Sequence, residues 1–380
     1  MKLGNAYVTN SNLLRFKRAP KRAAKRRKDE GVAFGKMKFG FSGVNLSTNV
    51  EHYSDVVSVV KYGEELGYDS AWLSDRVRDT YVNLTACALA TSRIRLLTGM
   101  INPYTRHPVI NARAVATLDE LSNGRMAMGI AVGNMIEMTR DLGFQTKGGS
   151  ERVREVGLIA RQLYEGKTVT FEGKYFQIHD VKLGMKSRPD IPIYVAGQGP
   201  KIMEVAGEIG NGAIIPYTDA KVIEHAKRSV KAGAERASKK FDSINLVSWL
   251  PTYITNEKQK VLDSLRGYGA LMTLFSPLPW LESIGMTEEK FDVIRKGYAK
   301  GAHVDPKLEA EYVRKAKGYV TDEIVELFTL IGTSAEINSK MEDLRKSGFN
   351  EFSLWVPSPV LVEKRRVLET FANDTMQRFR

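Results

Sequence analysis

Short apolar runs alternate with longer amphipathic segments from residue 38 onward. In the longer segments apolar residues recur at helical spacing, as at Val56, Val60 and Leu66, and Gly67 stands where that helix would end. The short runs predict strands at 38–42, 69–74, 94–99, 125–131, 191–196, 212–215, 245–254 and 351–355. The amphipathic segments predict helices at 50–66, 82–90, 108–121, 151–164, 201–209, 219–240 and 360–379.

This order of elements indicates an α/β fold built from serial strand–helix units. Eight such units over about 340 residues are typical of a (β/α)8 TIM barrel with insertions. A doubly wound open sheet is the alternative. The first predicted strand is not followed by a Gly-x-Gly-x-x-Gly sequence, which favours the closed barrel.

Two insertions interrupt the repeat. Residues 168–178 alternate apolar and β-branched positions around Glu172 and Gly173, which predicts a small hairpin. Residues 271–318 separate the helix after the seventh strand from the last unit, and they contain the proline-bearing apolar stretch 275–280. This composition fits a lid on the catalytic face, and it fits helical packing on the outside of the barrel equally well.

The composition narrows the class of protein. Of the 380 residues 43% are hydrophobic, enough to bury a large core. No uncharged run reaches the roughly 20 residues that a membrane-spanning helix needs. The lone cysteine, Cys87, lies in a small apolar segment where a buried packing role is expected, and a lone thiol suits a reducing cytoplasm. The five histidines form no pair at metal-ligand spacing, so no metal site is expected.

The net charge of +13 is concentrated at the start of the chain. Residues 1–38 contain twelve Lys/Arg and two acidic residues, which leaves only +3 for the rest. We therefore expect a basic, disordered extension at 1–36 and one barrel domain at 37–380. The extension could be an arm for an anionic partner such as nucleic acid, or a short amphipathic targeting segment. We favour a third interpretation, a true start at Met37, because residues 37–42 open a strand at once.

In a barrel, functional residues gather at the carboxyl ends of the strands. Those ends give candidates on four strands: Asp75; Gly99 and Met100; Gly133 and Asn134; and Gly197, Gln198, Gly199 and Pro200. The last group leads directly into a helix. Glycines let a backbone approach a ligand closely, and a helix N-terminus attracts an anion, so this turn predicts a phosphate site. Asp75 has an alternative role, which is to cap the segment that follows it.

Longer segments at these strand ends resemble the luciferase-like monooxygenase superfamily. They comprise residues 67–75, 94–108, 118–125, 193–201 and 206–213. The resemblance covers roughly residues 37–356 in the same order. Within the superfamily the chain is most similar to the branch that uses coenzyme F420, which includes methylenetetrahydromethanopterin reductase and F420-dependent dehydrogenases.

The resemblance implies a bacterial-luciferase-like barrel that binds coenzyme F420, with FMN as the alternative cofactor. It implies that Asp75 contacts the deazaflavin or the substrate, as the candidate catalytic residue for proton delivery or cation stabilisation. It also implies a non-prolyl cis peptide at Gly99–Met100, against the middle ring of the cofactor. The turn Gly197–Pro200 would hold the phosphate of the cofactor, and Gly133 and Asn134 would complete the binding site.

Two positions depart from the dehydrogenase pattern. In the F420-dependent dehydrogenases, a His follows the Asp that corresponds to Asp75, and this chain has Arg76 there. The dehydrogenases also have a Glu after the glycine that ends the fourth strand, and this chain has Asn134 there. An arginine stays protonated and cannot act as a base. The departures therefore favour a reductase, because hydride addition to a C=N or C=C bond demands less of protein acids and bases.

Four further residues carry specific expectations. Trp72 and Trp355 lie inside predicted strands and are expected in the core. His107 precedes Pro108 at a helix start, where capping or packing is expected. Arg106 lies near the end of the third strand, from which it could reach an anionic cofactor tail or form a surface salt bridge.

The leading hypothesis is an F420-dependent oxidoreductase that transfers a hydride between reduced deazaflavin and a small organic substrate, with a pterin-type C1 carrier as a candidate. One alternative is an FMN-dependent monooxygenase of the same fold. Another is a catalytically silent barrel whose basic arm binds nucleic acid. We expect a cytoplasmic homo-oligomer with a small-molecule substrate and with neither membrane nor nucleic acid as a partner.

Overall fold

The computed structural model describes residues 36–43, 53–75, 78–134, 138–139, 142–298, 318–358 and 360–380. Within these residues the strands are β1 (Lys38–Ser42), β2 (Ser70–Leu73), β3 (Arg95–Thr98), β4 (Met126–Ala131), β5 (Val169–Glu172), β6 (Gln177–Val181), β7 (Ile193–Ala196), β8 (Gly212–Ile215), β9 (Asn245–Ile254), β10 (Leu330–Gly332) and β11 (Glu351–Trp355). The helices are α1 (Tyr53–Glu65), α2 (Thr80–Ala90), α3 (Pro108–Leu121), α4 (Gly149–Tyr164), α5 (Pro200–Ile209), α6 (Ala220–Arg236), α7 (Lys258–Ser264), α8 (Arg266–Phe275), α9 (Leu278–Glu282), α10 (Glu288–Tyr298), α12 (Asp322–Leu327), α13 (Ser334–Lys346), α14 (Leu361–Phe371) and α15 (Gln377–Phe379). The basic extension predicted at 1–36 lies outside the described residues, apart from Lys36.

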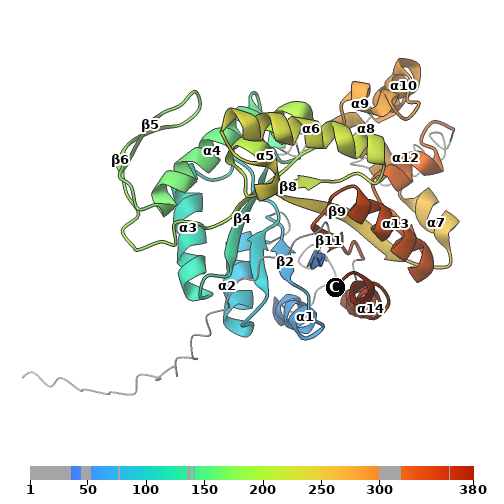
Figure 1. Ribbon diagram of the computed structural model, residues 1–380, viewed down its shortest axis with the longest axis horizontal. Helices are drawn as coiled ribbons and strands as arrows, with labels where there is room; N and C mark the ends of the chain where they lie inside the picture. Colours follow the sequence, from blue (N-terminus) through green and yellow to red (C-terminus); the bar gives the residue numbers. More distant parts are fainter. Residues whose placement is uncertain are drawn as a thin grey trace, which may run out of the picture. The chain divides into compact units, whose positions relative to one another are not determined.

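Eight of the described strands form a closed parallel barrel (Figure 1). Their order is β1-β2-β3-β4-β7-β8-β9-β11, and β11 pairs with β1 to close the ring. Helices that connect these strands surround them, as Figure 1 shows for α1 to α6. The predicted (β/α)8 barrel is therefore confirmed.

Most element boundaries follow the predictions. The strands β1, β8, β9 and β11 and the helix α3 agree with them to the residue. The helix α2 begins at Thr80 rather than at residue 82, because the carboxylate of Asp79 accepts hydrogen bonds from backbone N–H groups of its first turn. The helix α6 ends at Arg236 rather than at residue 240, and Ser238 then takes a φ of 53°. The terminal helix predicted at 360–379 contains a π-helical turn, Ala372–Met376.

His107 has the predicted capping role. Its Nδ1 accepts a hydrogen bond from the backbone N–H of Val109 at 3.4 Å, and Pro108 is the first residue of α3. The His107 ring also meets Phe176 edge-on, with ring centroids 6.0 Å apart. This contact links the start of α3 to the β5–β6 hairpin.

The strands β5 and β6 form the predicted hairpin. Glu155 of α4 is almost fully buried beneath its turn. The Glu155 carboxylate accepts hydrogen bonds from the backbone N–H groups of Lys174 at 2.7 Å, Tyr175 at 3.0 Å and Phe176 at 2.9 Å. Because a buried carboxylate needs such partners, these bonds fix the turn against the barrel.

The insertion predicted at 271–318 begins earlier, with α8 at Arg266, and its described part continues through α9 and α10. The helices α8, α9, α10 and α12 gather on one side of the barrel (Figure 1). The strand β10 and the helices α12 and α13 have no counterpart among the predicted elements. Through Leu330 and Thr252, β10 pairs in parallel with the carboxyl-terminal part of β9.

Six strands each contribute one side chain to a packed apolar layer inside the barrel: Trp72, Leu97, Ala127, Tyr194, Ile214 and Val247. Trp72 is fully buried, as predicted for a core residue. Above this layer, toward the carboxyl ends of the strands, lie Met100, Ala196 and Trp249, which are only partly buried. The packed interior therefore ends at a floor beneath the carboxyl ends.

A polar network closes the opposite, amino-terminal end of the barrel. Its centre is Glu351, the fully buried first residue of β11. Both Glu351 oxygens lie 2.9 Å from Nη2 of Arg95, and the carboxylate also accepts hydrogen bonds from Ser70 Oγ at 2.8 Å and Asn245 Nδ2 at 2.9 Å. The Tyr194 hydroxyl accepts a hydrogen bond from Arg95 Nη1 at 3.0 Å. These residues come from five different strands, so the network ties the barrel together.

Cys87 is buried, as predicted. Burial raises the pKa of its thiol to about 12, so the sulfur stays protonated and packs as an apolar group. In the part of the chain that the structure describes, no helix combines the length and apolar character needed to cross a bilayer.

Candidate active site

The predicted site residues follow four adjacent strands. The strands β2, β3, β4 and β7 pair in parallel in that order, so their carboxyl ends meet at one rim of the barrel, here called the mouth. Asp75 follows β2, Met100 follows β3, Gly133 follows β4 and Gly197 follows β7. Met100 and Gly197 are half-buried, whereas residues 96–98 of β3 and 193–195 of β7, further down the strands, are buried. The structure therefore brings the predicted residues to one accessible rim.

The end of β3 carries the expected non-prolyl cis peptide, between Gly99 and Met100. The hydroxyl of Ser74 donates a hydrogen bond to the Gly99 carbonyl at 2.7 Å, which joins the end of β2 to this peptide. On the next strand, a Cβ on Gly129 would lie 2.1 Å from the Thr98 carbonyl oxygen and 3.0 Å from the Met100 sulfur. Ser74 and Gly129 were not predicted as site residues. The contacts that make them important are to a neighbouring strand, and the sequence does not show such contacts.

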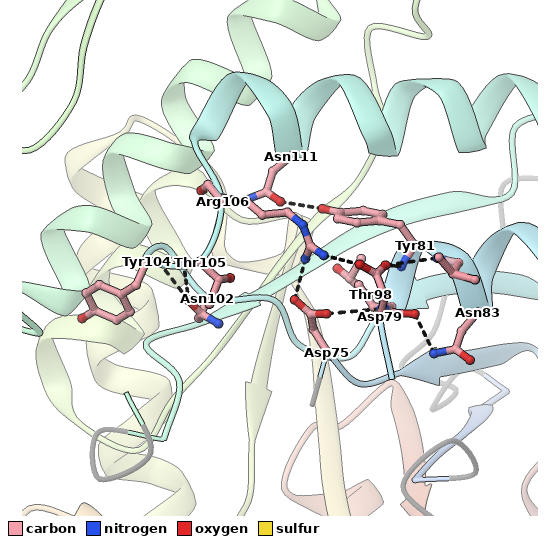
Figure 2. Close-up of polar contacts among 12 residues, drawn as sticks. Asp75, Asp79, Tyr81, Asn83, Thr98, Asn102, Tyr104, Thr105, Arg106 and Asn111 are labelled. Carbon is pink, nitrogen blue, oxygen red and sulfur yellow. Dashed lines mark hydrogen bonds and ion pairs between the residues drawn. The ribbon is translucent and has the colours of Figure 1, made fainter. Parts of the chain in front are cut away.

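Asp75 forms an ion pair with Arg106 (Figure 2). Asp75 Oδ2 lies 2.7 Å from Arg106 Nη1, and the two side chains are 12% and 25% exposed. The other oxygen, Asp75 Oδ1, accepts a hydrogen bond from the backbone N–H of Thr80 at 3.2 Å. Of the two roles considered for Arg106, the structure shows the salt bridge, and its partner is itself a predicted site residue.

The turn after β7 places the start of α5 at the mouth. The N-cap of α5 is Gly199, which has no side chain to cap the helix. A Cβ on Gly197 would lie 2.2 Å from the Ile202 side chain, so the turn requires glycine there. Next to Gly199 the nearest atom to an added Cβ is Pro277 Cγ, at 3.9 Å. Because the first N–H groups of a helix attract an anion, this open turn fits a phosphate group.

Gln198 fastens this turn to the insertion. Its Nε2 lies 3.3 Å from Ser276 Oγ and 3.4 Å from the Met272 carbonyl oxygen, at the end of α8. The Gln198 carbonyl accepts a hydrogen bond from the Tyr217 hydroxyl at 3.0 Å. Burial raises the pKa of Tyr217, which keeps this hydroxyl available as a donor. The beginning of the insertion therefore lies at the mouth, where it supports the predicted phosphate turn.

The predicted residues Gly133 and Asn134 follow β4. Gly133 has a φ of 87°, and a Cβ there would lie 3.2 Å from Cβ of Asn102, so the backbone requires glycine. Asn134 is half-buried, and its carbonyl accepts a hydrogen bond from the backbone N–H of Met138 at 2.9 Å. Arg76, the other departure from the dehydrogenase pattern, lies outside the described residues.

An aromatic stack on the far side of the mouth was not predicted as part of the site. Trp249 of β9 and Trp355 of β11 lie parallel, with ring centroids 5.6 Å apart and planes at 6°. Tyr268 of α8 meets Trp355 edge-on at 5.6 Å, and the Trp249 indole N–H donates to Ser42 Oγ at 2.7 Å. Trp355, expected in the core, is instead half-buried at the rim. Its place at the last position of its strand is the signal that could have revealed this role.

The mouth has the properties of a cofactor site. Glycine-containing turns allow close backbone approach, the start of α5 suits an anionic group, and the partly buried Met100 and Trp249 lie on the floor. Such a site at the carboxyl ends of the strands is typical of TIM-barrel enzymes, and its shape and polarity fit a ring-bearing, phosphorylated ligand. A family model described as "Luciferase-like monooxygenase" matches residues 32–351, and the chain belongs to this family.

Two kinds of relatives resemble this chain in sequence. A 5,10-methylenetetrahydromethanopterin reductase from Archaeoglobus fulgidus is 30% identical over 346 residues, which cover 90% of this chain and 100% of the relative. An F420-dependent glucose-6-phosphate dehydrogenase from Amycolatopsis mediterranei is 28% identical over 57% of this chain and 70% of the relative. The first similarity extends over nearly the whole barrel.

Among solved structures, a coenzyme F420 dependent tetrahydromethanopterin reductase from Methanopyrus kandleri superposes with a TM-score of 0.75 and 26% identity. The match covers 91% of this chain and 100% of that protein. An F420-dependent secondary alcohol dehydrogenase shares the fold, with a TM-score of 0.69 at 20% identity over 89% of this chain and 98% of that protein.

Proposed function

We propose that this protein is an F420-dependent oxidoreductase that acts as a reductase on a small organic substrate. The observation that carries the proposal is the rim formed by Asp75, the half-buried Met100 and the open turn Gly197–Pro200 at the ends of neighbouring barrel strands. Its support is the similarity to methylenetetrahydromethanopterin reductases over their full length. When bound, the deazaflavin supplies a hydride and its two electrons.

Each part of the rim has a separate task toward the cofactor. The backbone N–H groups at the start of α5 would hold the phosphate. The partly buried Met100 and Trp249 would provide apolar contacts to the ring. Gly133 and Asn134 complete the binding site next to β4. The packed interior layer below excludes water from the floor, which protects the hydride transfer from solvent.

The residues at the mouth favour reduction of the substrate over its oxidation. Hydride addition to the carbon of a cationic C=N bond forms one C–H bond and neutralises the nitrogen, so the step consumes no proton. Asn134 cannot act as a carboxylate base, and Asp75 is engaged with Arg106. A pterin-type C1 carrier offers such an electrophile, and the reductases named above are similar to this chain. We therefore propose a pterin-type C1 carrier as the substrate class.

Fluorescence titration of the purified protein with F420 tests the cofactor, and oxidation of reduced F420 on addition of methylenetetrahydromethanopterin tests the substrate. We expect saturable F420 binding and a rate that requires the pterin. A protein that retains tight yellow FMN and consumes oxygen would instead be a monooxygenase. F420 binding without turnover of any pterin would refute only the substrate assignment.

We further propose that the protein is a homo-oligomer that associates through α2. Val82 and Leu89 lie two turns apart on α2 and are 61% and 70% exposed, and Ile110 on the neighbouring α3 is 47% exposed. Exposed apolar residues in such a group are typical of an interface. Sedimentation velocity of Val82→Glu/Leu89→Glu should show a smaller particle than the wild type. Val362→Glu, at a position 76% exposed on α14, is the control and should leave the particle unchanged.

We retain two proposals on location and partners. A cytoplasmic location fits the buried, protonated Cys87, which needs no oxidising compartment. Nucleic acid is not proposed as a partner, because most of the positive charge lies in residues 1–38 and not in the barrel. Deletion of residues 1–36 should leave F420 affinity unchanged. Salt-sensitive DNA binding that this deletion abolishes would contradict the proposal.

A further inference from the structure

Arg106 connects the predicted catalytic aspartate to the start of α2 (Figure 2). Its Nη1 lies 2.7 Å from Asp75 Oδ2, and its Nη2 pairs with Asp79 Oδ2. The guanidinium carbon also lies 5.0 Å from the centroid of the Tyr81 ring, within the range of a cation–π contact. One side chain thus spans two carboxylates and an aromatic face.

The backbone that carries Arg106 is itself held in place. The Asn102 side-chain oxygen accepts hydrogen bonds from the backbone N–H groups of Tyr104 at 2.9 Å and Thr105 at 3.1 Å, which forms a turn directly before Arg106. The Arg106 carbonyl accepts a hydrogen bond from Asn111 Nδ2 at 3.4 Å. Asn111 Oδ1 in turn accepts from the Tyr81 hydroxyl at 2.7 Å (Figure 2).

These contacts leave Asp75 little freedom. One of its oxygens faces Arg106 and the other faces the backbone N–H of Thr80. The side chain of Asp75 is 12% exposed, so water screens this ion pair less than it screens a pair on the open surface. Each carboxylate oxygen still has a second lone pair, which is available to a ligand. Asp75 is therefore fixed as an oriented acceptor.

We infer that Arg106 is a positioning residue that holds Asp75 as an oriented carboxylate at the mouth, so that Asp75 attracts a cationic electrophile and does not deliver a proton. The inference rests on the proposed function and decides between the two roles expected for Asp75. A carboxylate fits hydride addition to a cationic C=N bond, because that step needs no proton. Reduced F420 is the hydride donor, and it leaves oxidised by two electrons.

The test compares variants at position 106 in the full-length protein. In Arg106→Met, Asp75 and Asp79 lose the cation that they share, and we expect kcat to fall about 100-fold, as for a misplaced catalytic group. The dissociation constant of F420, measured by fluorescence titration, should change less than about threefold, because the phosphate turn lies on another strand. Arg106→Lys keeps the charge but not the two-pronged geometry, and its kcat should lie between those of the wild type and Arg106→Met.

Three further variants separate positioning from general structural damage. Arg113→Met removes an exposed arginine from α3, the helix that follows Arg106, and should match the wild type. Asp79→Asn keeps a good N-cap for α2 but removes one anchor of Arg106, so its loss should be smaller than that of Arg106→Met. If Arg106 acts through Asp75, the double variant Asp75→Asn/Arg106→Met should be no slower than the slower single variant.

Two results would overturn the inference. One is that the losses of kcat in the two single variants add up in the double variant. The other is an unchanged kcat in an Arg106→Met variant that binds F420. If Arg106→Met does not fold, Arg106→Lys and Asp79→Asn carry the comparison, and wild-type kcat in both would overturn it. Failure of the wild type to oxidise reduced F420 with any pterin refutes the substrate assignment of the proposed function instead, because no kcat can then be compared. The two failures are thus distinguishable.

Discussion

The two ends of the barrel satisfy their polar groups in opposite ways. At the amino-terminal end, Glu351 is fully buried and accepts hydrogen bonds from Arg95, Ser70 and Asn245. At the mouth, the helix α5 starts without a side-chain cap, and Asp75 keeps lone pairs free for a ligand. Where every polar group has its hydrogen-bond partners, that end of the barrel is stable and offers nothing to a ligand. Where donors and acceptors remain open, that end of the barrel can bind a ligand.

One cation at each end shows the same difference. Burial opposes the charge of Arg95, yet the nearby Glu351 carboxylate raises the pKa of Arg95 above its ordinary value. Lys364 of α14 is almost fully buried, and its ammonium group donates to the backbone carbonyls of Gly43 and Val356, which follow β1 and β11. Burial lowers the pKa of Lys364 to about 8. The amino-terminal end holds a paired charge, and the mouth is supported by a lysine that loses its charge easily.

The largest effect is expected at the amino-terminal end. Glu351→Gln leaves Arg95 without a counter-charge and should lower the free energy of unfolding by about 3–5 kcal/mol, as for a broken buried ion pair. Urea denaturation measures this loss. Activity per folded molecule should be unchanged, because the network lies at the end opposite the mouth. Glu235→Gln, in an exposed pair with Lys231, is the control and should cost less than about 0.5 kcal/mol. Equal losses in both variants would remove the distinction between the two ends.

The second effect is a pH dependence that arises beside the mouth. The pKa of Lys364 is lowered from 10.5 to about 8 in the folded protein, so between these values the unfolded chain binds more protons and stability rises with pH. The gain across this window is up to about 3 kcal/mol. Lys364→Met cannot titrate, so its unfolding free energy should rise less from pH 8 to 10.5 than that of the wild type. Lys239, whose pKa burial also lowers to about 8, titrates in both proteins and cancels in the difference. Parallel curves for the two proteins would contradict the assignment.

The smallest effect concerns the phosphate turn. In Gly197→Ala the new Cβ would meet the Ile202 side chain at 2.2 Å, so the turn must shift. We expect the F420 dissociation constant to rise about tenfold, or about 1.4 kcal/mol. In Gly199→Ala the nearest atom to the new Cβ is Pro277 Cγ at 3.9 Å, an ordinary van der Waals contact, so the effect should be smaller. Gly184→Ala, which meets open space and lies away from the mouth, is the control. Equal F420 affinity in all three variants would argue against a phosphate at this turn.

The amino-acid sequence by itself determined the order of elements and the ends of the strands. The alternation of apolar runs and amphipathic segments is local, and a barrel requires functional residues at strand ends, so Asp75, Gly99 and Gly197 could be named in advance. The same local logic explains why α3 and β9 agree with the prediction to the residue. The strand β10 was missed because three residues are too few to show a periodicity.

Only the tertiary structure decided which side chains meet. Asp75 and Arg106 are 31 positions apart, and the parallel pairing of β2 with β3 brings their loops together. Trp249 and Trp355 stack because β9 and β11 are neighbours in the closed ring, and α8 reaches the phosphate turn through Gln198. Hydrophobic periodicity records the face on which a residue lies, not its partner on another strand. Partners depend on register and closure, which are properties of the whole barrel.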